Sequence, residues 1–296
     1  MAAEHAVSTC TEIINICGGG NQGLLCGIGH FVGLMPEAML TPSSVPDLAL
    51  DPVTARIAGA LYPDADIRQQ PFEKSKLTDE SFDLAISNVP FGDYTVHDPR
   101  WNDFKFPIHD YFFAAALDKV RPGGLLMFVT SRHTLDKLDS RLGESLGSRS
   151  ELLGAIRLPN TAFKKNAGTE VTTDIVMLRK LPPGETRRGP AWEKIQDFTN
   201  HDYLKIPINE YFVKRPHLML GNLQVTGKMY GGVEPTLTSD GRVLEDALAV
   251  AISELPKGIY HAQRIDSPAL NTKPTIPAPD FVKPNAYCVH EDGRLC

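Results

Sequence analysis

The run Phe82-Asp-Leu-Ala-Ile-Ser87, followed at once by Asn88-Val-Pro-Phe91, decides how this chain folds. A short apolar run bounded by polar residues is typical of a buried strand. The four residues after it place an amide, a proline turn and an aromatic ring at the carboxyl end of that strand. We therefore predict a buried strand over residues 82–87 that carries a candidate site at the edge of a sheet.

The segments around this run alternate between helical and extended patterns. After a polar and aromatic loop at 92–107, apolar side chains recur at helical spacing over 108–120, and Arg121-Pro-Gly-Gly124 is typical of a helix end. The other predicted elements are strands at 125–130, 152–158 and 173–178 and a helix at 135–146. Strands that alternate with helices indicate βαβ units, so we predict an α/β fold with a mostly parallel sheet and helices on both faces.

The composition excludes several classes of protein. The chain has 296 residues and a net charge of -6, and 42% of its residues are hydrophobic, which is ordinary for a globular protein. No stretch approaches the roughly 20 apolar residues of a membrane span, and the N-terminus lacks the pattern of a secretory leader. The five cysteines show no C-x-x-C spacing. We therefore expect a reducing compartment, the cytoplasm, with no membrane and no metal.

The chain divides into three parts by residue composition and by the pattern of predicted helices and strands. Residues 1–23 form an atypical N-terminal segment, 24–182 the predicted catalytic domain, and 183–296 a Pro-rich C-terminal extension or linker. The extension shows one good helical pattern, at 242–255, and holds five prolines at 267–284. We therefore expect it to be irregular and partly disordered.

The tetrapeptide Asn88-Val89-Pro90-Phe91 has the groups needed to hold a planar ring that bears an amine. The Asn88 side-chain oxygen and a backbone carbonyl of Val89 or Pro90 can accept the two amine protons, which aims the nitrogen lone pair at a methyl donor. The Phe91 ring can stack on a base extruded from a duplex. The alternative is a plain proline turn with Phe91 anchored in the core, and the tetrapeptide alone does not decide between the two.

Four stretches in a fixed order carry a resemblance to a known family. They are Gly27-Ile-Gly-His-Phe31 with Gly33-Leu-Met-Pro36, the Asn88 tetrapeptide, His109-Asp-Tyr-Phe112 with Arg121-Pro-Gly-Gly124, and Leu158-Pro-Asn-Thr-Ala-Phe163 with residues 168–174. In these stretches the chain resembles the adenine-specific (N6) DNA methyltransferases, whose motif reads Asn/Asp/Ser-Pro-Pro-Tyr/Phe. It looks most like the forms found in large phage and mobile-element proteins that also contain a helicase.

The resemblance implies a Rossmann-like methyltransferase fold that takes S-adenosylmethionine as methyl donor and DNA as substrate. Asn88, Val89, Pro90 and Phe91 match its catalytic motif. The cofactor-binding positions that it implies are Gly27, Gly29, Phe31, Phe72 and Glu73, and the positions beside the target base are Pro159 and Phe163. The next residues, Lys164 and Lys165, either contact DNA phosphate or lie in a solvated loop. A helicase domain of the same or a neighbouring polypeptide is a further partner that the resemblance suggests.

Two departures from the family pattern fall at the cofactor site. The family has a glutamate two residues before the Asp-Pro pair at the end of the second strand, where this chain has Ala49. Losing that charge-assisted hydrogen bond to the ribose costs about 1.5–3 kcal/mol, or roughly a ten- to hundredfold loss of affinity. Asp51 is the residue that could compensate in part. Gly23-Leu-Leu-Cys26 also replaces the acidic residue and proline that usually precede the glycine turn, so we expect the residues before Leu24 to be foreign to the family.

Three interpretations of the function stay open. The leading one is transfer of a methyl group to the exocyclic amino nitrogen of adenine in DNA, with activity impaired by the altered cofactor site. The second is a methyltransferase that acts on a protein glutamine or an RNA base, and the third is a non-catalytic remnant that binds nucleic acid or a partner. Residues 1–99 carry 4 basic and 13 acidic side chains, whereas 100–188 carry 15 and 10, so a modest basic region follows the Asn88 motif.

Overall fold

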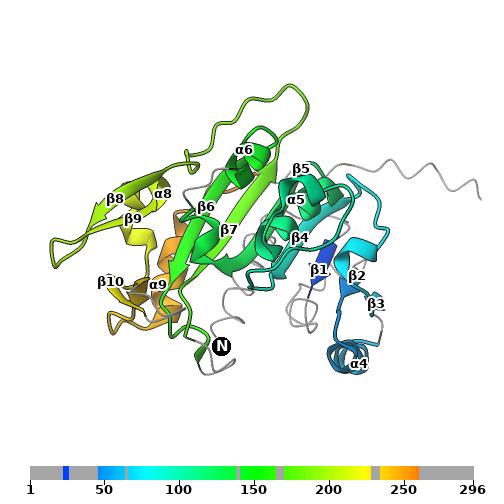
Figure 1. Cartoon of the computed structure of the whole chain (residues 1–296), viewed down its shortest axis with the longest axis horizontal. Coiled ribbons are helices and arrows are strands. Elements are labelled where there is room, and N and C mark those ends of the chain that lie inside the picture. Colours follow the sequence, from blue (N-terminus) through cyan, green and yellow to red (C-terminus); the bar gives the residue numbers. More distant parts are fainter. Residues whose placement is uncertain are drawn as a thin grey trace, which may run out of the picture. The chain divides into compact units, whose positions relative to one another are not determined.

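A seven-stranded sheet forms the centre of the fold (Figure 1). The computed structural model describes residues 23–26, 46–63, 66–137, 141–164, 170–227 and 234–259, and of residues 23–26 the backbone alone. The strands of the sheet are β1 (Gly23–Cys26), β2 (Pro46–Leu48), β3 (Asp66–Arg68), β4 (Phe82–Asn88), β5 (Val120–Ser131), β6 (Ser150–Leu158) and β7 (Thr173–Lys180). Their order is β3-β2-β1-β4-β5-β7-β6, and all neighbours are parallel except that β7 runs antiparallel to β5 and β6. The predicted α/β fold with a mostly parallel sheet is confirmed.

The path of the chain through the sheet changes direction at β1. From β1 the chain runs outward through β2 to β3, and it then returns to β4, which pairs with the other side of β1. Cys26 of β1 lies opposite Ser87 of β4, so both strands end at the same edge of the sheet. In open α/β sheets, ligands bind outside the carboxyl ends of the strands at such a switch point.

The hydrophobic core lies along β4 to β7. Every residue of β4 up to Ser87 is buried, as the apolar run predicted. Helix α5 (Ile108–Lys119) packs on β4 and β5, and all of its residues 108–117 are buried. The Phe113 ring of α5 meets the Phe128 ring of β5 edge to face, with 5.0 Å between ring centroids. This packing fixes the strand that leads to Asn88.

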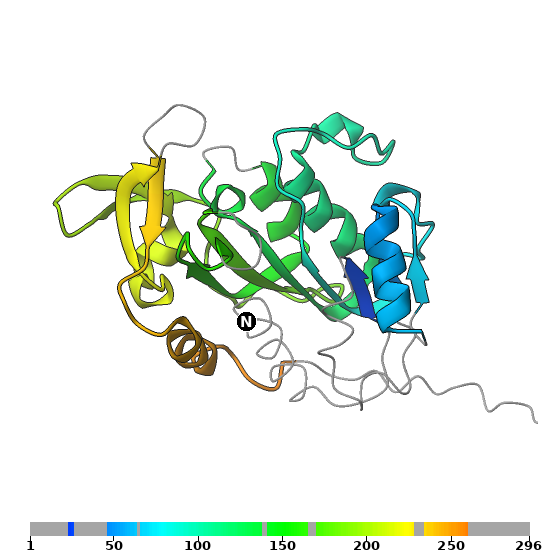
Figure 2. The ribbon, with the colours of Figure 1, turned by 90° about the horizontal axis from the view of Figure 1, so that it is seen from below.

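The remaining helices flank the sheet. They are α4 (Pro52–Leu61), α6 (Arg141–Gly147), α8 (Glu210–Lys214) and α9 (Leu244–Ser253), with short 3-10 turns η1 (Phe72–Lys74), η2 (Asn102–Phe104), η3 (Arg132–Thr134) and η4 (Pro216–Leu218). Figure 2 shows α5 and α9 on opposite faces of the strands, so helices cover both faces as predicted. Within the described part of the chain, no helix is long and apolar enough to cross a membrane.

The region after β7 is more regular than its prolines suggested. It holds the hairpin β8 (Ile195–Thr199) and β9 (Lys205–Asn209), the antiparallel pair β10 (Asn222–Gly227) and β11 (Glu234–Thr238), and α9 where a helix was predicted. Pro207 and Pro235 lie within two-stranded sheets, where a strand can lack one ladder hydrogen bond without being disrupted. Residues 183–259 belong to the same compact unit as the sheet, and the predicted disorder at 267–284 lies outside the described residues.

Two predicted element boundaries were wrong. Strand β5 begins at Val120, so Arg121-Pro-Gly-Gly124 lies inside a strand and not at a helix end. The extra residues of β5 in this stretch appear as a shift in its register with β4. The helix predicted over 135–146 is present only as α6, because Asp136 turns inward to pair with Arg157 instead of continuing a helix. Residues 138–140 lie outside the described part.

Candidate functional site

The candidate site lies at the carboxyl edge of the sheet, where β4 delivers the Asn88 tetrapeptide beside the end of β1. Asn88 is the last residue of β4, and it is exposed whereas the six residues before it are buried. Its side chain forms no hydrogen bond with any described residue, so both its oxygen and its NH₂ group are available to a ligand. The amide is therefore placed as the sequence predicted, at a strand end and facing solvent.

The residues after Asn88 combine a buried anchor with an exposed ring. Val89 is buried, and its N–H donates to the carbonyl of Val129 on β5 at 3.0 Å. Pro90 is half-buried, and the Phe91 side chain is 40% exposed. Phe91 therefore does not anchor the core, which removes the main support for the plain-turn alternative.

The loop from Gly92 to Pro107 is held to the scaffold by a dense set of hydrogen bonds. Asp98 accepts the Tyr111 hydroxyl at 2.9 Å, and its backbone carbonyl accepts the N–H groups of Trp101 and Asn102. Burial and the hydrogen bond to Asp98 raise the pKa of Tyr111, so this hydroxyl stays protonated and donates. Trp101 is buried, so it packs in the core rather than in an exposed binding site.

Of the two residues at the end of β2 that bear on cofactor binding, one is apolar and the other is charged. Ala49 directly follows β2 and is buried, so a methyl group occupies the strand end where the family places a carboxylate. Asp51 is exposed and caps α4, with Oδ2 accepting both the N–H and the hydroxyl of Thr54 at 2.7 Å. These hydrogen bonds hold the pKa of Asp51 below its ordinary value, so the carboxylate is charged at neutral pH.

The other expected cofactor residues are only partly available. Phe72 is buried, and its ring stacks on Phe112 of α5 with 5.3 Å between centroids. Glu73, next to it in η1, is half-buried. Gly27, Gly29 and Phe31, and the residues up to 22 that were expected to be foreign to the family, lie outside the described residues.

The predicted substrate residues after β6 lie at the same edge of the sheet. Leu158 of β6 pairs with Thr173, which pairs with Ser131 of β5, so β6 and β5 end at the same level. Because β6 is three strands away from β4, its end lies about 14 Å from Asn88 across the sheet. Pro159 is buried and Phe163 is half-buried. Lys164 is exposed but pairs with Glu170 at 2.6 Å, and Lys165 lies outside the described residues.

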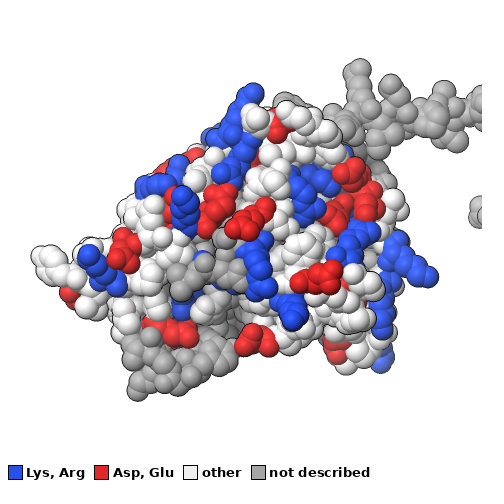
Figure 3. All heavy atoms as spheres, turned by 45° about the horizontal axis from the view of Figure 1, so that its top comes forward, with Lys and Arg blue, Asp and Glu red and all other residues white. Residues whose placement is uncertain are grey.

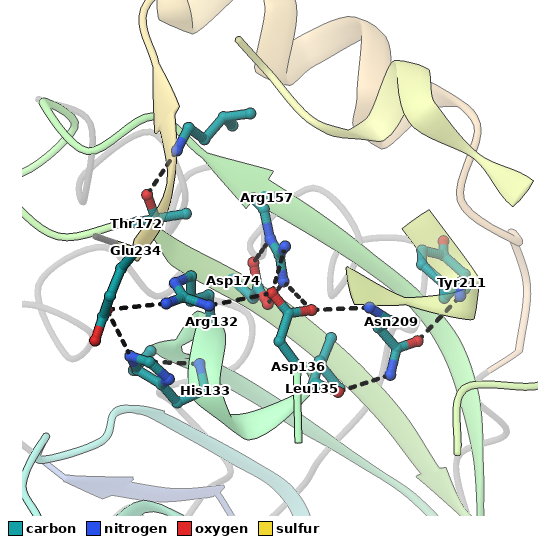
Figure 4. A network of polar contacts seen from close by, with 12 residues as sticks. Arg132, His133, Leu135, Asp136, Arg157, Thr172, Asp174, Asn209, Tyr211 and Glu234 are labelled. Atoms are coloured by element: carbon teal, nitrogen blue, oxygen red, sulfur yellow. Dashed lines mark hydrogen bonds and ion pairs between the residues drawn. The ribbon is translucent and has the colours of Figure 1, made fainter. Parts of the chain in front are cut away.

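A buried polar network, not predicted from the sequence, ties this edge to the C-terminal region (Figure 4). Arg157 of β6 is fully buried; its Nε donates to Asp174 Oδ1 and its Nη1 to Asp136 Oδ2, both at 2.8 Å. Burial lowers the pKa of Arg157, but the carboxylates of Asp136 and Asp174 outweigh it and raise that pKa, so the guanidinium stays charged. Charged residues inside otherwise apolar strands were the sequence signal for this pairing.

The network continues into the region after β7. The backbone N–H of Asn209, at the end of β9, donates to Asp136 Oδ1 at 2.9 Å. Arg132, just after β5, donates to Glu234 of β11 at 2.9 Å. The N–H of Asn160 donates to the carbonyl of Leu237 on β11 at 2.8 Å, so the segment after β6 is held from the C-terminal side.

His109 lies buried in the first turn of α5. Neither of its ring nitrogens finds a hydrogen-bond partner among the described residues. Burial, with further contributions from Lys137 and His133, lowers its pKa to about 4, so the ring is neutral at physiological pH. Lys137 itself pairs with Asp110, the next residue of the helix. A buried neutral ring fits a structural role for this histidine.

The basic excess in residues 100–188 is largely neutralised within the fold. Figure 3 shows blue and red side chains interspersed over this face rather than gathered into one basic stripe. The basic side chains of this segment that form ion pairs with acidic ones are Arg100, Lys119, Arg121, Arg132, Lys137, Arg149, Arg157, Lys164, Arg179, Lys180 and Arg187. Within the described part of this segment, most basic side chains are therefore engaged by carboxylates of the chain, which leaves a weak electrostatic footprint for DNA phosphate.

No family model matches the chain. The chain is 33% identical over 143 residues to the "Defense against restriction protein B" of Escherichia phage P1, an alignment that covers 47% of this chain and 6% of that much longer protein.

Among solved structures, one similar chain is a Listeria monocytogenes protein assigned as a class I S-adenosylmethionine-dependent methyltransferase. The TM-score is 0.51 at 17% identity, over 64% of this chain and 62% of that one. Another is assigned as the modification subunit of a type I restriction enzyme from Vibrio vulnificus. Here the TM-score is 0.52 at 15% identity, over 83% of this chain and 60% of that one. The chain thus has the fold of class I S-adenosylmethionine-dependent methyltransferases.

Proposed function

We propose that this chain transfers a methyl group from S-adenosylmethionine to the exocyclic amino nitrogen of adenine in DNA. The observation that carries the proposal is the exposed Asn88 amide, which has no hydrogen-bond partner in the described structure and stands at the carboxyl end of β4 beside the switch point of the sheet. Phe91 adds an exposed aromatic ring three residues later. An amide and a ring at this edge suit a planar, amine-bearing substrate.

In the proposed reaction the protein positions the amine. The Asn88 carboxamide oxygen accepts one N–H of the adenine amino group, and a backbone carbonyl of Val89 or Pro90 accepts the other. These hydrogen bonds draw the protons away from the nitrogen lone pair and aim it at the methyl donor. The proton is lost to solvent after transfer, so no side chain needs to act as a base. Phe91 stacks on the extruded base and holds its plane.

The residues present fit S-adenosylmethionine in part. The switch point at β1 and β4 is the ligand position of this fold, and Asp51 offers a charged, exposed carboxylate near the end of β2 that can accept ribose hydroxyls. Ala49 offers no such group, and Oδ2 of Asp51 is already engaged by Thr54. Gly27, Gly29, Phe31 and Glu73 are the further residues that would hold the cofactor. When bound, it supplies an electrophilic methyl group on its sulfonium sulfur.

Methyl transfer to unmethylated DNA is the direct test. We expect tritium from labelled S-adenosylmethionine to enter the adenine amino group, and Asn88→Ala to lower kcat roughly a hundredfold, because an aligned acceptor is lost. Gln196→Ala is a matched control, since Gln196 is an exposed amide on β8, on the other side of β6 from Asn88. Equal activity of Asn88→Ala and the wild-type protein would refute the role of Asn88.

A non-catalytic, methyltransferase-like binding protein is the second candidate, and buried Ala49 is the observation that favours it. Calorimetry with S-adenosylmethionine separates the two functions. Measurable binding supports the enzyme, whereas no binding at millimolar cofactor supports the non-catalytic protein. Transfer to a protein glutamine or to RNA, with none to DNA, would keep the enzyme and change its substrate.

The partners that we propose follow from the relatives and the charge pattern. The phage relative is named for defence against restriction, and one structural neighbour is assigned to a restriction enzyme, so we propose a role in restriction, modification or protection from it. Because the basic side chains Arg132, Lys137 and Lys164, which follow strands at the carboxyl edge or lie near it, are paired with carboxylates of the chain, we expect the isolated chain to bind DNA weakly. A helicase or another DNA-binding partner would then supply affinity, and DNA binding measured with and without such a partner tests this.

A further inference from the structure

A second aromatic side chain, Tyr94, follows the tetrapeptide closely in the chain and is open to solvent. Its side chain is 55% exposed. Among the described residues its ring stacks on no other aromatic ring, and its hydroxyl forms no hydrogen bond. Phe104 in the same loop is also exposed, but its ring stacks on Phe106 at 5.1 Å between centroids. Phe91 and Tyr94 are thus the exposed rings of this loop without an aromatic neighbour.

The Tyr94 ring lies against Gly92, the residue directly after Phe91. A Cβ atom at Gly92 would lie 2.5 Å from Cε1 and 2.7 Å from Cδ1 of Tyr94, so a side chain at this position would displace the ring. Gly92 is not among the described residues with a positive φ, so its backbone does not call for glycine. The glycine therefore serves to admit the Tyr94 ring against the backbone directly after Phe91.

The backbone at Tyr94 is fixed to the scaffold. Its carbonyl accepts the N–H of Ile108, the first residue of α5, at 2.8 Å. Thr95 forms a β-bridge with Pro107, which leads into the same helix. The ring is consequently carried by a short, tethered segment between the end of β4 and the start of α5, and little conformational entropy is lost when it binds a ligand.

We infer that Tyr94 is a substrate-contacting residue whose ring provides, with Phe91, a second aromatic face for the target nucleobase. This inference rests on the proposed function and extends it by one residue outside the tetrapeptide. An exposed ring whose Cδ1–Cε1 side lies against Gly92 can accept a flat ligand on an open face, and stacking of a base on an aromatic ring is sequence-tolerant. The hydroxyl is not needed for this role.

Binding of single-stranded oligonucleotides tests the inference apart from catalysis. The probe is a fluorescent oligonucleotide with a central dA, compared by anisotropy with the same strand carrying an abasic site there. We expect the wild-type chain to prefer dA and Tyr94→Ala to lose about tenfold of that preference. Tyr94→Phe should keep it. Tyr203→Ala is the matched control, because Tyr203 is 89% exposed at the β8–β9 turn, far along the chain from β4.

Gly92→Ala is an independent variant that keeps the tyrosine at position 94 but changes the position of its ring. The added methyl displaces the ring, so this variant should lose preference for dA about as much as Tyr94→Ala does. The double variant should be no worse than Tyr94→Ala alone, because both changes act through the same ring. A double variant with additive losses would place the effect of Gly92 elsewhere and weaken the inference.

The outcomes separate this inference from the proposed function. If Tyr94→Ala keeps the preference for dA, if Tyr94→Phe loses as much as Tyr94→Ala, or if the wild-type chain does not distinguish dA from an abasic site, the inference is wrong. If wild-type protein transfers no methyl group to DNA but Tyr94→Ala abolishes base preference, the inference stands and the proposed reaction fails. In an active enzyme, Tyr94→Ala should raise KM for DNA about tenfold without changing the affinity for S-adenosylmethionine.

Discussion

The two halves of the sheet differ in the length of their strands and in the burial of their helices. On the side that we propose holds the cofactor (the cofactor half), β1, β2 and β3 have four, three and three residues. On the side that carries the Asn88 motif (the substrate half), β4, β5, β6 and β7 have seven, twelve, nine and eight. The helices differ in the same way. All residues 108–117 of α5 are buried, but α4 leaves Val53, Ile57 and Leu61 at least half exposed.

The ion pairs of the two halves also differ in burial. The Arg68–Asp66 pair on β3 is solvent-exposed, with about two-fifths of each side chain accessible, whereas Arg157 and Asp174 are wholly buried. Exposed pairs contribute little to stability, but breaking a buried pair leaves an uncompensated charge. From this comparison we expect the half at β4 to β7 to be the more stable in the free protein, and the half at β1 to β3 to gain stability when a ligand binds there.

Removing Arg157 should have the largest effect. Arg157→Met leaves Asp136 and Asp174 buried without their shared cation, so we expect a loss of about 3–5 kcal/mol in the free energy of unfolding. Urea denaturation followed by circular dichroism measures it. Adding Asp174→Asn to Arg157→Met should recover part of the loss. A loss below about 1 kcal/mol for Arg157→Met would remove the energetic basis of the comparison.

Restoring an acid at the cofactor edge should have the next largest effect. Ala49→Glu places a carboxylate where the resembled family has one, and we expect S-adenosylmethionine to bind roughly ten- to a hundredfold more tightly, or about 1.5–3 kcal/mol. Calorimetry measures the affinity. Leu50→Glu is a matched control, because Leu50 is the next residue and its side chain is 71% exposed. Equal gains from both variants would point to general charge rather than to a specific contact.

The buried His109 should make the substrate half sensitive to acid. Its folded pKa of about 4 lies below the ordinary value of 6.5, so the unfolded chain binds the proton first as the pH falls. The stability is fully present above pH 6.5 and is lost toward pH 4, by at most about 2 kcal/mol at pH 5. Urea denaturation at pH 7 and pH 5 should show a flatter pH dependence for His109→Gln. His201→Gln, at an exposed position, should leave the wild-type profile unchanged.

The smallest effect is expected for the exposed pair on β3. Arg68→Ala should lower the free energy of unfolding by less than about 1 kcal/mol, because solvent screens this pair. Its change in urea midpoint, compared with that of Arg157→Met, measures the difference between the two halves directly. Losses of similar size would show that length and burial of the strands do not set their stability.

The sequence predicted those parts of the fold that local patterns determine. The apolar run of β4, the helical spacing in α5 and the strands β6 and β7 carry their structure in neighbouring residues. The prediction of a helix from residue 135 was wrong because Asp136 pairs with Arg157, which lies 21 residues further along the chain. No local pattern in the sequence reveals such a partner. The strands after β7 were missed because all four are short, and a proline interrupts the pattern of β9 and of β11.

The candidate site was predicted to a similar extent. The sequence predicted that Asn88 and Phe91 follow a buried strand, because residue type and position at a strand end suffice to suggest their chemistry. Tyr94, which we propose as a further substrate contact, was not predicted, although Gly92 two residues before it is the signal that a ring could lie against the backbone. The roles of Asp51 and Phe72 depend on what they contact, and the N-cap and the aromatic stack that engage them appear only in three dimensions.

The network around Arg157 also limits how this module can be exchanged between larger polypeptides. A gene fusion joined near residue 182 would remove the Asn209 N–H from Asp136 and Glu234 from Arg132, and with them the strand that holds Asn160. Recombination that moves this edge of the sheet intact must therefore carry the chain through β11. We expect shuffled descendants of this module to share their joints beyond that strand rather than at the end of β7.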